Sequence, residues 1–329
     1  MKQTKNDRGI QIRRRIKAFF GRWIGLRRSW WRYVKNANCD YYASQARFIY
    51  VLTSNYHVIE KCLAMPDFEP GHGQERVETV IGDLFKYREL GFDWHHPQYI
   101  AAMQAVQEYG QVHKQLGYAL PEELQADIER LLEGTNISEH HQPHVTRDQF
   151  FAHLNGSFED FARSRHSVRA YSDKEISNET IRAVVDLART TPTSCNRQPN
   201  KIYVVCDTEK IKLIIAWQGG GRGFGENANK LFIVTTAIEA FGNDEYNEVF
   251  KVGGMYAMNL LYALHAYQIG ACALNWRGNK QKDNLLRSML DIPDNEEVII
   301  VIAAGYPPEE FKYVQSGRNN VAESLILVK

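Results

Sequence analysis

Hydrophobic residues recur at helical spacing through the first half of the chain. They follow the repeat of three to four residues that places side chains on one face of a helix. A proline followed by two glutamates at Pro121 is typical of a helix start, because proline suits the first turn and the acids face the positive end of the helix dipole. The pattern predicts helices over residues 12–35, 43–64, 74–90, 98–117, 121–134 and 147–164.

After Phe161 the pattern changes to short apolar runs that alternate with amphipathic segments. The apolar runs have the length and β-branched content of strands, and the longer segments have the helical repeat. Strands are predicted at 201–206, 230–236, 271–276 and 297–304, and helices at 176–190, 245–268 and 279–290. Alternation of this kind is typical of a layered α/β or α+β domain.

A chain of 329 residues is long for one hydrophobic core. The polar stretch 134–144 is the best candidate for a linker, and we predict a basic segment at 1–38, a helical domain at 39–145 and a second domain at 146–329. The linker histidines His140, His141 and His144 could bind a metal. A solvated linker is favoured because no matching set of ligands stands nearby. The five cysteines have no CxxC spacing, so neither a zinc site nor a disulfide framework is expected.

Charge is distributed unevenly along the chain. Residues 1–37 contain twelve Lys or Arg and a single acid, Asp7. Within 12–35, aromatic and aliphatic residues recur between the cations, as in helices that lie on an anionic membrane surface. The alternative is that this helix packs onto the protein itself or onto a protein partner, and both interpretations stay open. Nucleic acid is disfavoured because no recognised binding module follows.

No stretch approaches the roughly eighteen apolar residues of a spanning helix, and arginines interrupt the apolar run that a secretory signal would need. We therefore expect a cytoplasmic protein, in contact with the inner face of the membrane if the basic helix binds lipid.

Two polar runs flank the first helix of the second domain. Arg165, Ser167 and Arg169 would share one face of an extended segment, where two guanidinium groups beside a hydroxyl suit a phosphate. The run 191–199 is rich in turn formers and leaves hydroxyls and amides free to bind a polar ring edge. Either run alone is more typical of an ordinary solvated surface.

Taken together, these runs resemble the opening of the nitroreductase family. RHSVRAYSDKEIS is followed by a helix ending LARTTPTSCNRQPNKIYVV, and the likeness continues through GGMYAMNLLYALHAYQIG, ACALNW and IPDNEEVIIVIAAGYPPEE. It spans roughly half of the chain. The resemblance implies an α+β fold with a mixed sheet flanked by helices, which binds FMN and forms an intertwined homodimer. The all-α domain would precede it.

The resemblance also assigns residues to the flavin. Arg165, Ser167 and Arg318, with Ser316 beside it, would bind the phosphate and ribityl chain; His166 would contribute its backbone and Arg169 would face the N1/C2-oxygen edge. The set approaching from the other subunit would be Pro192, Thr193, Ser194 and Asn196, with Gln198 supporting that turn. The strand end Asn275, Trp276 and Arg277 would lie over the ring. No side chain is expected to act as a catalytic nucleophile, acid or base, since the flavin carries the chemistry.

The strand end departs from the family pattern. Better-known members carry Pro-x-Glu-Gly where this chain has Asn275-Trp276-Arg277-Gly278. Arg277 therefore suggests the hypothesis of an anionic substrate. The glycine-rich run 219–225 has a helix before it and a strand after it, which is opposite to a dinucleotide-binding turn, so a mobile loop near the flavin is favoured.

The sequence thus predicts an enzyme that passes electrons from NADH or NADPH through FMN to an electron-poor small molecule. Residues 56–66 resemble a module fused to nitroreductase-like domains in bacterial polysaccharide synthesis, which suggests a dedicated step there. Within them, His57, Glu60 and Lys61 could form a polar site, although a surface ion pair is favoured. The alternative function is a flavin-binding or degenerate scaffold that the basic helix recruits to a membrane-bound synthesis complex.

Overall fold

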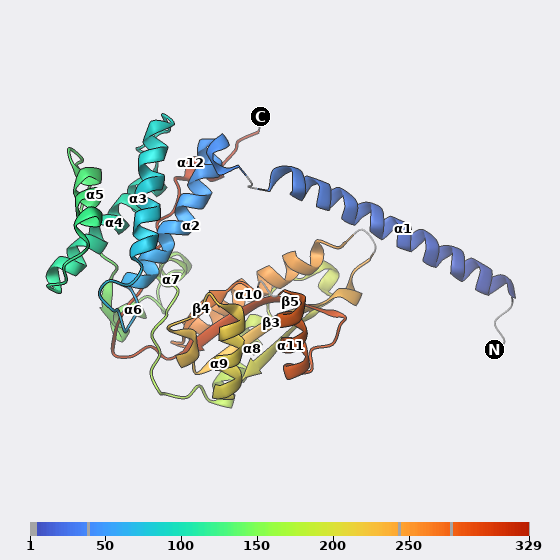
Figure 1. Ribbon diagram of the computed structural model, residues 1–329. Helices are drawn as coiled ribbons and strands as arrows, with labels where there is room; N and C mark the ends of the chain where they lie inside the picture. The colour runs from blue at the N-terminus through green and yellow to red at the C-terminus, as the bar shows by residue number, and fades with distance from the viewer. Residues whose placement is uncertain (1–4, 38–39, 243–244, 277–278, 329) are drawn as a thin grey trace. The chain divides into compact units, whose positions relative to one another are not determined.

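The computed structural model describes residues 5–37, 40–242, 245–276 and 279–328 (Figure 1). Its internal contacts divide the chain into two compact units. The α/β unit comprises Met1–Ala37, Leu154–Arg165 and Tyr171–Tyr306. The helical unit comprises Asn38–His153, His166–Ala170 and Pro307–Lys329. Each unit is described by itself below.

The helical unit is built on four helices that lie close to their predicted positions. They are α2 (Gln45–Leu63), α3 (Gln74–Glu89), α4 (Pro97–Gln115) and α5 (Glu122–Leu132). Ser44 caps α2 by accepting from the Arg47 N–H, and proline begins α4. The core between them is rich in aromatic rings that are almost fully buried, namely Phe48, Tyr56, Tyr87, Tyr99 and Tyr109. Three short helices, η1 (Tyr41–Ala43), α6 (Arg147–Phe150) and α12 (Val321–Ser324), also belong to this unit.

A two-stranded ladder joins distant parts of the chain within the helical unit. Strand β1 (His144–Thr146) pairs antiparallel with β6 (Glu310–Lys312), and neither strand was predicted. The stretch 134–144 is solvated along most of its length, as predicted, but Gln142 is buried. Its backbone N–H and Nε2 donate to the carboxylate of Glu108, at 2.7 and 3.1 Å, and Glu108 is itself 3% exposed. This part of the linker is therefore packed into the helical unit.

The single helix predicted over 147–164 is wrong. The chain forms α6 (Arg147–Phe150) and, after a turn, α7 (Phe158–Ser164). The break falls at residues 155–157, where Asn-Gly-Ser favours a turn. Ser157 then starts α7 through a capping box with Asp160, in which each residue satisfies a backbone N–H of the other. The local turn and cap chemistry overrides the helical spacing of the apolar residues.

The α/β unit contains a four-stranded sheet in the order β2-β3-β5-β4 (Figure 1). Its strands are β2 (Asn200–Val205), β3 (Lys230–Ala237), β4 (Gly270–Leu274) and β5 (Glu296–Gly305). The α+β class is confirmed. All strand pairs among the described residues are antiparallel, so the expected mixture of parallel and antiparallel neighbours is not seen there. The two central strands β3 and β5 provide most of the buried sheet positions.

The same unit contains four helices, α8 (Asn178–Ala188), α9 (Thr208–Gln218), α10 (Glu248–Ala266) and α11 (Lys280–Leu290). The short 3-10 turns η2 (Ser194–Asn196), η3 (Gly225–Asn227) and η4 (Ile238–Ala240) lie between them. Helix α10 shares one core with β3 and β5, through Leu260, Phe232 and Ile302. Gly253 permits its close approach, because a Cβ there would lie 2.5 Å from Ile299 Cγ1.

Helix α1 (Lys5–Asn36) extends the predicted basic helix at both ends. Within the described part of the chain, no helix is both long and apolar enough to cross a membrane.

Candidate functional site

The turn after α8 has an unusual backbone. Three of its residues that carry side chains adopt positive φ angles, namely Cys195 (54°), Asn196 (55°) and Gln198 (50°). Such conformations cost free energy for residues other than glycine, and they cluster at functional sites where the surrounding structure fixes them. This turn is the run 191–199 that the sequence indicated.

Side-chain hydrogen bonds hold the turn in this shape. The Ser194 hydroxyl donates to Glu248 Oε2 at the start of α10, at 2.6 Å. The Gln198 backbone N–H donates to Thr193 Oγ1 at 3.0 Å. Pro192, Asn196 and Gln198 remain exposed. The turn therefore presents an amide-bearing surface on a rigid support, with Thr193 and Ser194 turned inward to build it.

Two carboxylates at the start of α10 take part in this arrangement, and sequence reasoning missed both. Hydrogen bonds from Lys251 and the turn serine lower the pKa of the Glu248 carboxyl. The backbone N–H of Gly242 and the side chain of Arg197 lower the pKa of Glu245. Arg197 donates to both Glu245 oxygens, at 2.9 and 3.0 Å. Both acids stand in the first turn of a long predicted helix, which was the only local signal.

The end of strand β4 is fixed by α9. Gln218 Nε2 donates to the Asn275 carbonyl at 2.9 Å, and its Oε1 accepts the N–H groups of Gly220 and Gly221. The indole N–H of Trp276 donates to Asp283 Oδ1 at 3.1 Å. One glutamine thus ties the glycine-rich run to the strand end. That run follows a helix and precedes β3, as predicted. Arg277 lies outside the described residues.

The segment Arg165–Arg169 divides between the two units. Arg165 ends α7 in the α/β unit, whereas His166–Ala170 belongs to the helical unit. Val168 and Arg169 are both buried, so burial does not alternate along the segment as a simple extended strand would predict. The His166 ring lies 4.5 Å from that of Tyr313, centroid to centroid. The helical unit therefore contains Ser167 and Arg169 together with the tail residues.

The tail residues Ser316 and Arg318 belong to the helical unit, and Arg318 borders a cavity with residues of α2 and α4. Ser316 has a φ of 54°, and Arg318 Nη1 donates to its carbonyl. Arg318 is exposed and lines a cavity of about 450 Å³. The other lining residues are Ile49, Tyr50, Thr53, Gln98, Gly317, Asn319 and Ser324. The structure thus places this predicted phosphate-binding arginine on the helical unit.

His57 and Glu60 form the predicted pair, but the prediction that it lies at the surface is wrong for Glu60. Nδ1 of His57 lies 2.8 Å from Glu60 Oε2, but Glu60 is 4% exposed. Glu60 lines a cavity of about 180 Å³ with Gln104, Gln142 and His140 among its neighbours. Among the residues that the structure describes, no group of three or more His, Cys, Asp or Glu side chains could hold a metal ion.

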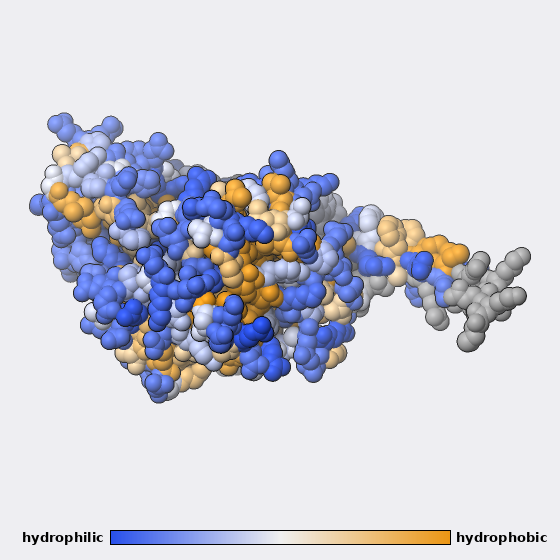
Figure 2. Space-filling view, turned by 90° about the horizontal axis from the view of Figure 1, so that it is seen from below, coloured by the Kyte–Doolittle hydropathy of each residue, from blue (hydrophilic) through white to orange (hydrophobic). Residues whose placement is uncertain are grey.

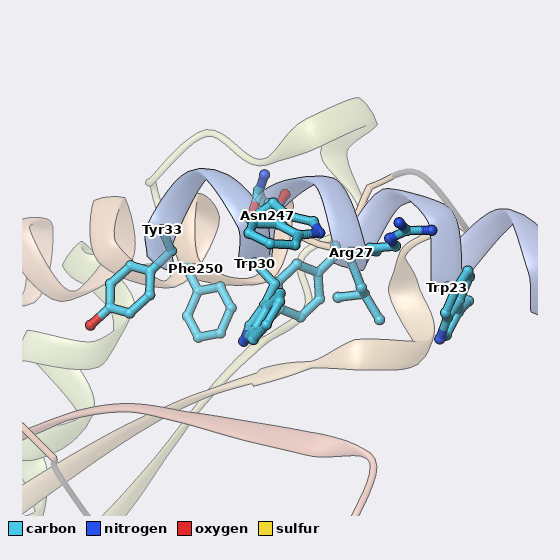
Figure 3. A pocket seen from close by; sticks show the side chains of 10 residues that line it. Trp23, Arg27, Trp30, Tyr33, Asn247 and Phe250 are labelled. Atoms are coloured by element: carbon cyan, nitrogen blue, oxygen red, sulfur yellow. The ribbon is translucent and has the colours of Figure 1, made fainter. Parts of the chain in front are cut away.

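Helix α1 exposes large aromatic side chains between its cations. Figure 2 shows hydrophobic residues beside hydrophilic ones at the surface of this helix. Trp23, Trp30 and Trp31 are 53%, 57% and 54% exposed. The C-terminal part of α1 borders a cavity of about 870 Å³ whose other wall includes Tyr246, Asn247 and Phe250 (Figure 3). The aromatic rings remain more than half exposed despite this contact, so packing within the α/β unit does not bury them.

Comparison with known proteins identifies the family. The model of the nitroreductase family matches residues 162–232 and 213–306. A protein of Archaeoglobus fulgidus named "Putative NADH dehydrogenase/NAD(P)H nitroreductase" is 30% identical over 156 residues, which cover 46% of this chain and 87% of that protein.

Among solved structures, an FMN-dependent nitroreductase of Clostridium difficile is 22% identical, with a TM-score of 0.43, over 51% of this chain and 98% of its own. A nitroreductase family protein of Streptococcus pneumoniae is 20% identical, with a TM-score of 0.45, over 52% of this chain and all of its own length. The relative from Archaeoglobus is matched over nearly its whole length, and with the family match this means that the chain belongs to the nitroreductase family.

Proposed function

We propose that this protein is an FMN-dependent oxidoreductase that uses NADH or NADPH as reductant. Membership of the nitroreductase family carries the proposal, because the match includes both polar runs that the sequence singled out. The chemistry that bound FMN supplies is the transfer of electrons from the nicotinamide to an electron-poor small molecule. The residues of this chain bind and orient the flavin, and none of them is needed as a nucleophile.

The donors in the helical unit suit the phosphate end of FMN. Ser167 and Arg318 offer a hydroxyl and an exposed guanidinium, which are the groups that bind phosphate in proteins. Arg169 is 7% exposed, and a buried guanidinium is costly to desolvate. The carbonyl edge of a flavin would add acceptors to it. In this proposal Ser316 and the backbone of His166, which belong to the same unit, also serve the phosphate end.

The donors in the α/β unit suit the ring end. The rigid turn 192–198 presents Asn196 and Gln198 at the surface, and Asn275 and Trp276 end strand β4. In this proposal the turn approaches a flavin of the other subunit.

We propose a homodimer, and the exposed apolar face of α10 supports it. Phe250, Met255 and Met258 are 42%, 48% and 36% exposed there, and a Cβ on Gly254 would meet nothing within 4 Å. Residues 250, 254 and 258 recur every fourth position and so form one apolar stripe. A second copy would cover it, and the small residue would let two helices approach closely.

The experiment is a flavin titration of the purified full chain. We expect bound FMN, or uptake of added FMN, with the absorbance of oxidised flavin lost on addition of NADH or NADPH. Protein that ignores added FMN would defeat the proposal. The matched variants are Asn196→Ala, at the exposed turn, and Asn227→Ala, outside every predicted site residue. Only the first is expected to weaken flavin binding.

The acceptor is an electron-poor small molecule, and we propose a dedicated step in a polysaccharide pathway rather than general detoxification. The reason is the attached helical unit, which a general reductase does not need. Reoxidation of the reduced protein should be followed with nitroaromatics, quinones and sugar nucleotides in parallel. Arg277→Glu tests the preference for anions. Unchanged reoxidation rates with every anionic acceptor would contradict it.

The second candidate function is a scaffold that helix α1 recruits to a membrane-bound complex, and the exposed tryptophans of α1 favour a membrane contact. We propose that residues 12–35 bind the cytoplasmic face of an anionic bilayer. Ile12, Ile16, Phe19, Trp23 and Trp30 fall on one stripe of the helix, and no acid occurs between Asp7 and Asp40.

Vesicle sedimentation tests this contact. The full chain is expected to bind vesicles of mixed anionic and zwitterionic lipid, and to be released by high salt, because each cation near the surface adds roughly 1 kcal/mol. Trp23→Ala combined with Trp30→Ala should weaken binding. Equal binding to purely zwitterionic vesicles would argue for a protein partner instead. If the protein binds vesicles but NADH and NADPH do not reduce its flavin, the scaffold function is favoured over the enzyme.

A further inference from the structure

The cavity that Glu60 lines has a volume of about 180 Å³, and all of its described lining residues belong to the helical unit. Helix α2 contributes Glu60, α4 contributes Gln104 and two alanines, and the linker and the C-terminal tail form the remaining walls. A water occupies about 30 Å³ in the liquid, so this volume corresponds to roughly six waters. Sites for drug-sized ligands start near ~300 Å³, so the cavity is too small for a flavin or a dinucleotide.

Glu60 places a carboxylate against this cavity. The residue is 4% exposed, and Nδ1 of His57 lies 2.8 Å from its Oε2. Among the residues that the structure describes, no hydrogen-bond donor to the second oxygen, Oε1, is recorded. A buried carboxylate is costly unless donors or an opposite charge compensate it. One imidazole nitrogen is a small complement for such a group, and the adjoining cavity leaves room for a ligand that supplies the rest.

The other polar walls are amides and an imidazole. Gln104 Nε2 donates to the carbonyl and the hydroxyl of Ser138, at 3.1 and 3.2 Å, which leaves its amide oxygen to accept from a ligand. His140 and Gln315 also line the cavity. There is no lysine or arginine among the described lining residues, so none of them supplies a fixed positive charge to Glu60.

The walls formed by the linker and the tail are held in place by hydrogen bonds outside the cavity's own ligand groups. Gln142 donates twice to the buried Glu108, and its Oε1 accepts the N–H of Gln315 at 3.3 Å. Gln98, which is 5% exposed, donates from Nε2 to the carbonyl of Gly317 at 3.3 Å. These segments therefore do not have to be ordered when a ligand binds, and that saving favours affinity.

We propose that this cavity binds a small amino alcohol, with the ammonium group on Glu60 and the hydroxyls on the amide walls. A primary ammonium has three N–H donors and a positive charge, and its hydrogen bonds to a carboxylate are about twice as strong as neutral ones. The volume limits the ligand to roughly six non-hydrogen atoms, one for each water that it displaces. A divalent metal ion fits less well, because Glu60 is the single carboxylate among the described lining residues.

The test compares serinol with glycerol. They have the same number of non-hydrogen atoms and differ in the central group, which is an ammonium in serinol at neutral pH and a hydroxyl in glycerol. Dissociation constants for the full chain are measured by saturation-transfer NMR. Serinol should bind about tenfold more tightly than glycerol, because its ammonium pairs with the carboxylate. Glu60→Gln keeps the shape of the side chain but removes its charge, so it should reduce this preference to within about twofold.

Two further variants separate binding from folding. Ala101→Leu fills the cavity and leaves Glu60 intact, so both ligands should lose binding even if Glu60→Gln proves unstable. Asp83→Asn is the matched control, because Asp83 is another buried carboxylate of the same unit, 8% exposed, which accepts from Asn55 Nδ2 at 3.0 Å away from the cavity. It should leave the ratio of the two dissociation constants unchanged.

Wild-type protein that binds serinol no better than glycerol, or binds neither, overturns the proposal. Binding that survives both Glu60→Gln and Ala101→Leu also overturns it, because the ligand then lies elsewhere. Displacement of serinol by an equal concentration of potassium chloride would indicate an inorganic cation and refute the amino alcohol. None of these outcomes depends on the flavin, so protein that prefers serinol but ignores FMN contradicts only the proposed function.

Discussion

The two neighbouring glycines of α10 give a stringent test of how this helix meets the sheet. A methyl group on Gly253 would lie 2.5 and 2.8 Å from Ile299 Cγ1 and Cδ1, and 2.7 Å from Thr236 Oγ1. A methyl group on Gly254 would meet nothing within 4 Å. The two variants Gly253→Ala and Gly254→Ala therefore change the same residue type in the same helix, and differ only in what the new atom contacts.

The magnitude follows from two opposing terms. Replacing glycine by alanine inside a helix gains about 1 kcal/mol in both variants. Overpacking a core costs about 1–3 kcal/mol, and the upper end applies at Gly253 because all three distances are below 3.0 Å. Thr236 is fully buried and its hydroxyl donates to Asn200 Oδ1 at 2.9 Å, so it cannot turn away without losing that bond. In protein dilute enough to be monomeric, we expect Gly253→Ala to lower the free energy of unfolding by about 2 kcal/mol, and Gly254→Ala to raise it by up to about 1 kcal/mol.

Hydrogen exchange is the suitable assay, because amides of β3 and β5 report on the α/β unit separately from α2 and α4. Gly253→Ala should speed exchange of the sheet amides and leave those of the helical unit unchanged. Measurements over a tenfold range of protein concentration separate folding from association. If Gly253→Ala proves as stable as Gly254→Ala, the close packing of α10 on the sheet is refuted.

Further variants test buried polar groups and a helix start. Burial acts to raise the pKa of Glu296, but its ion pair with Lys201 and hydrogen bonds from two neighbours hold that pKa below its usual value. The wild type should therefore be more stable than Glu296→Gln at neutral pH. In acid denaturation this advantage should be lost below about pH 4, where the carboxylate becomes protonated. Gln142→Leu removes the Nε2 donor from the buried carboxylate of Glu108 but keeps the backbone N–H donor, so it should cost about 2 kcal/mol in urea unfolding. No measurable cost would mean that Glu108 finds another donor. Ser157→Ala should cost about 1 kcal/mol by loss of the capping box, seen as faster exchange of the first amides of α7 alone.

Periodicity located most elements of both units within a few residues, because hydrophobic spacing is set by the same burial that stabilises them. The failures were of two physical kinds. One is local competition, as at Ser157, where a cap and a turn outweigh an apolar repeat that would continue the helix. The other is long-range pairing, as in the three-residue strands β1 and β6, whose stability comes from a partner far along the chain.

The candidate site shows the same division. The residue types in 165–169 and 191–199 could be read from the sequence, since phosphate and ring-edge binding require particular donors. The positive φ angles at Cys195 and Asn196, and the contact from Gln98 to Gly317, could not. Such features depend on the surrounding structure rather than on the residues that show them, so they become visible only in three dimensions.

The pairing of β1 with β6 has a consequence for the order in which the protein is made. Thr146 pairs with Glu310, and the backbone N–H of Arg147 donates to the Glu309 carbonyl at 2.7 Å. The chain therefore leaves the ladder at one residue and returns beside it more than 160 residues later. On the ribosome, the helices α2 to α5 emerge early, but β1 has no partner strand until β6 is synthesised. Every strand of the four-stranded sheet is synthesised before β6. Truncation just before β6 should yield chains whose four-stranded sheet is complete in sequence but whose helical unit lacks the partner strand of β1. A protease is expected to cut these chains at β1 first.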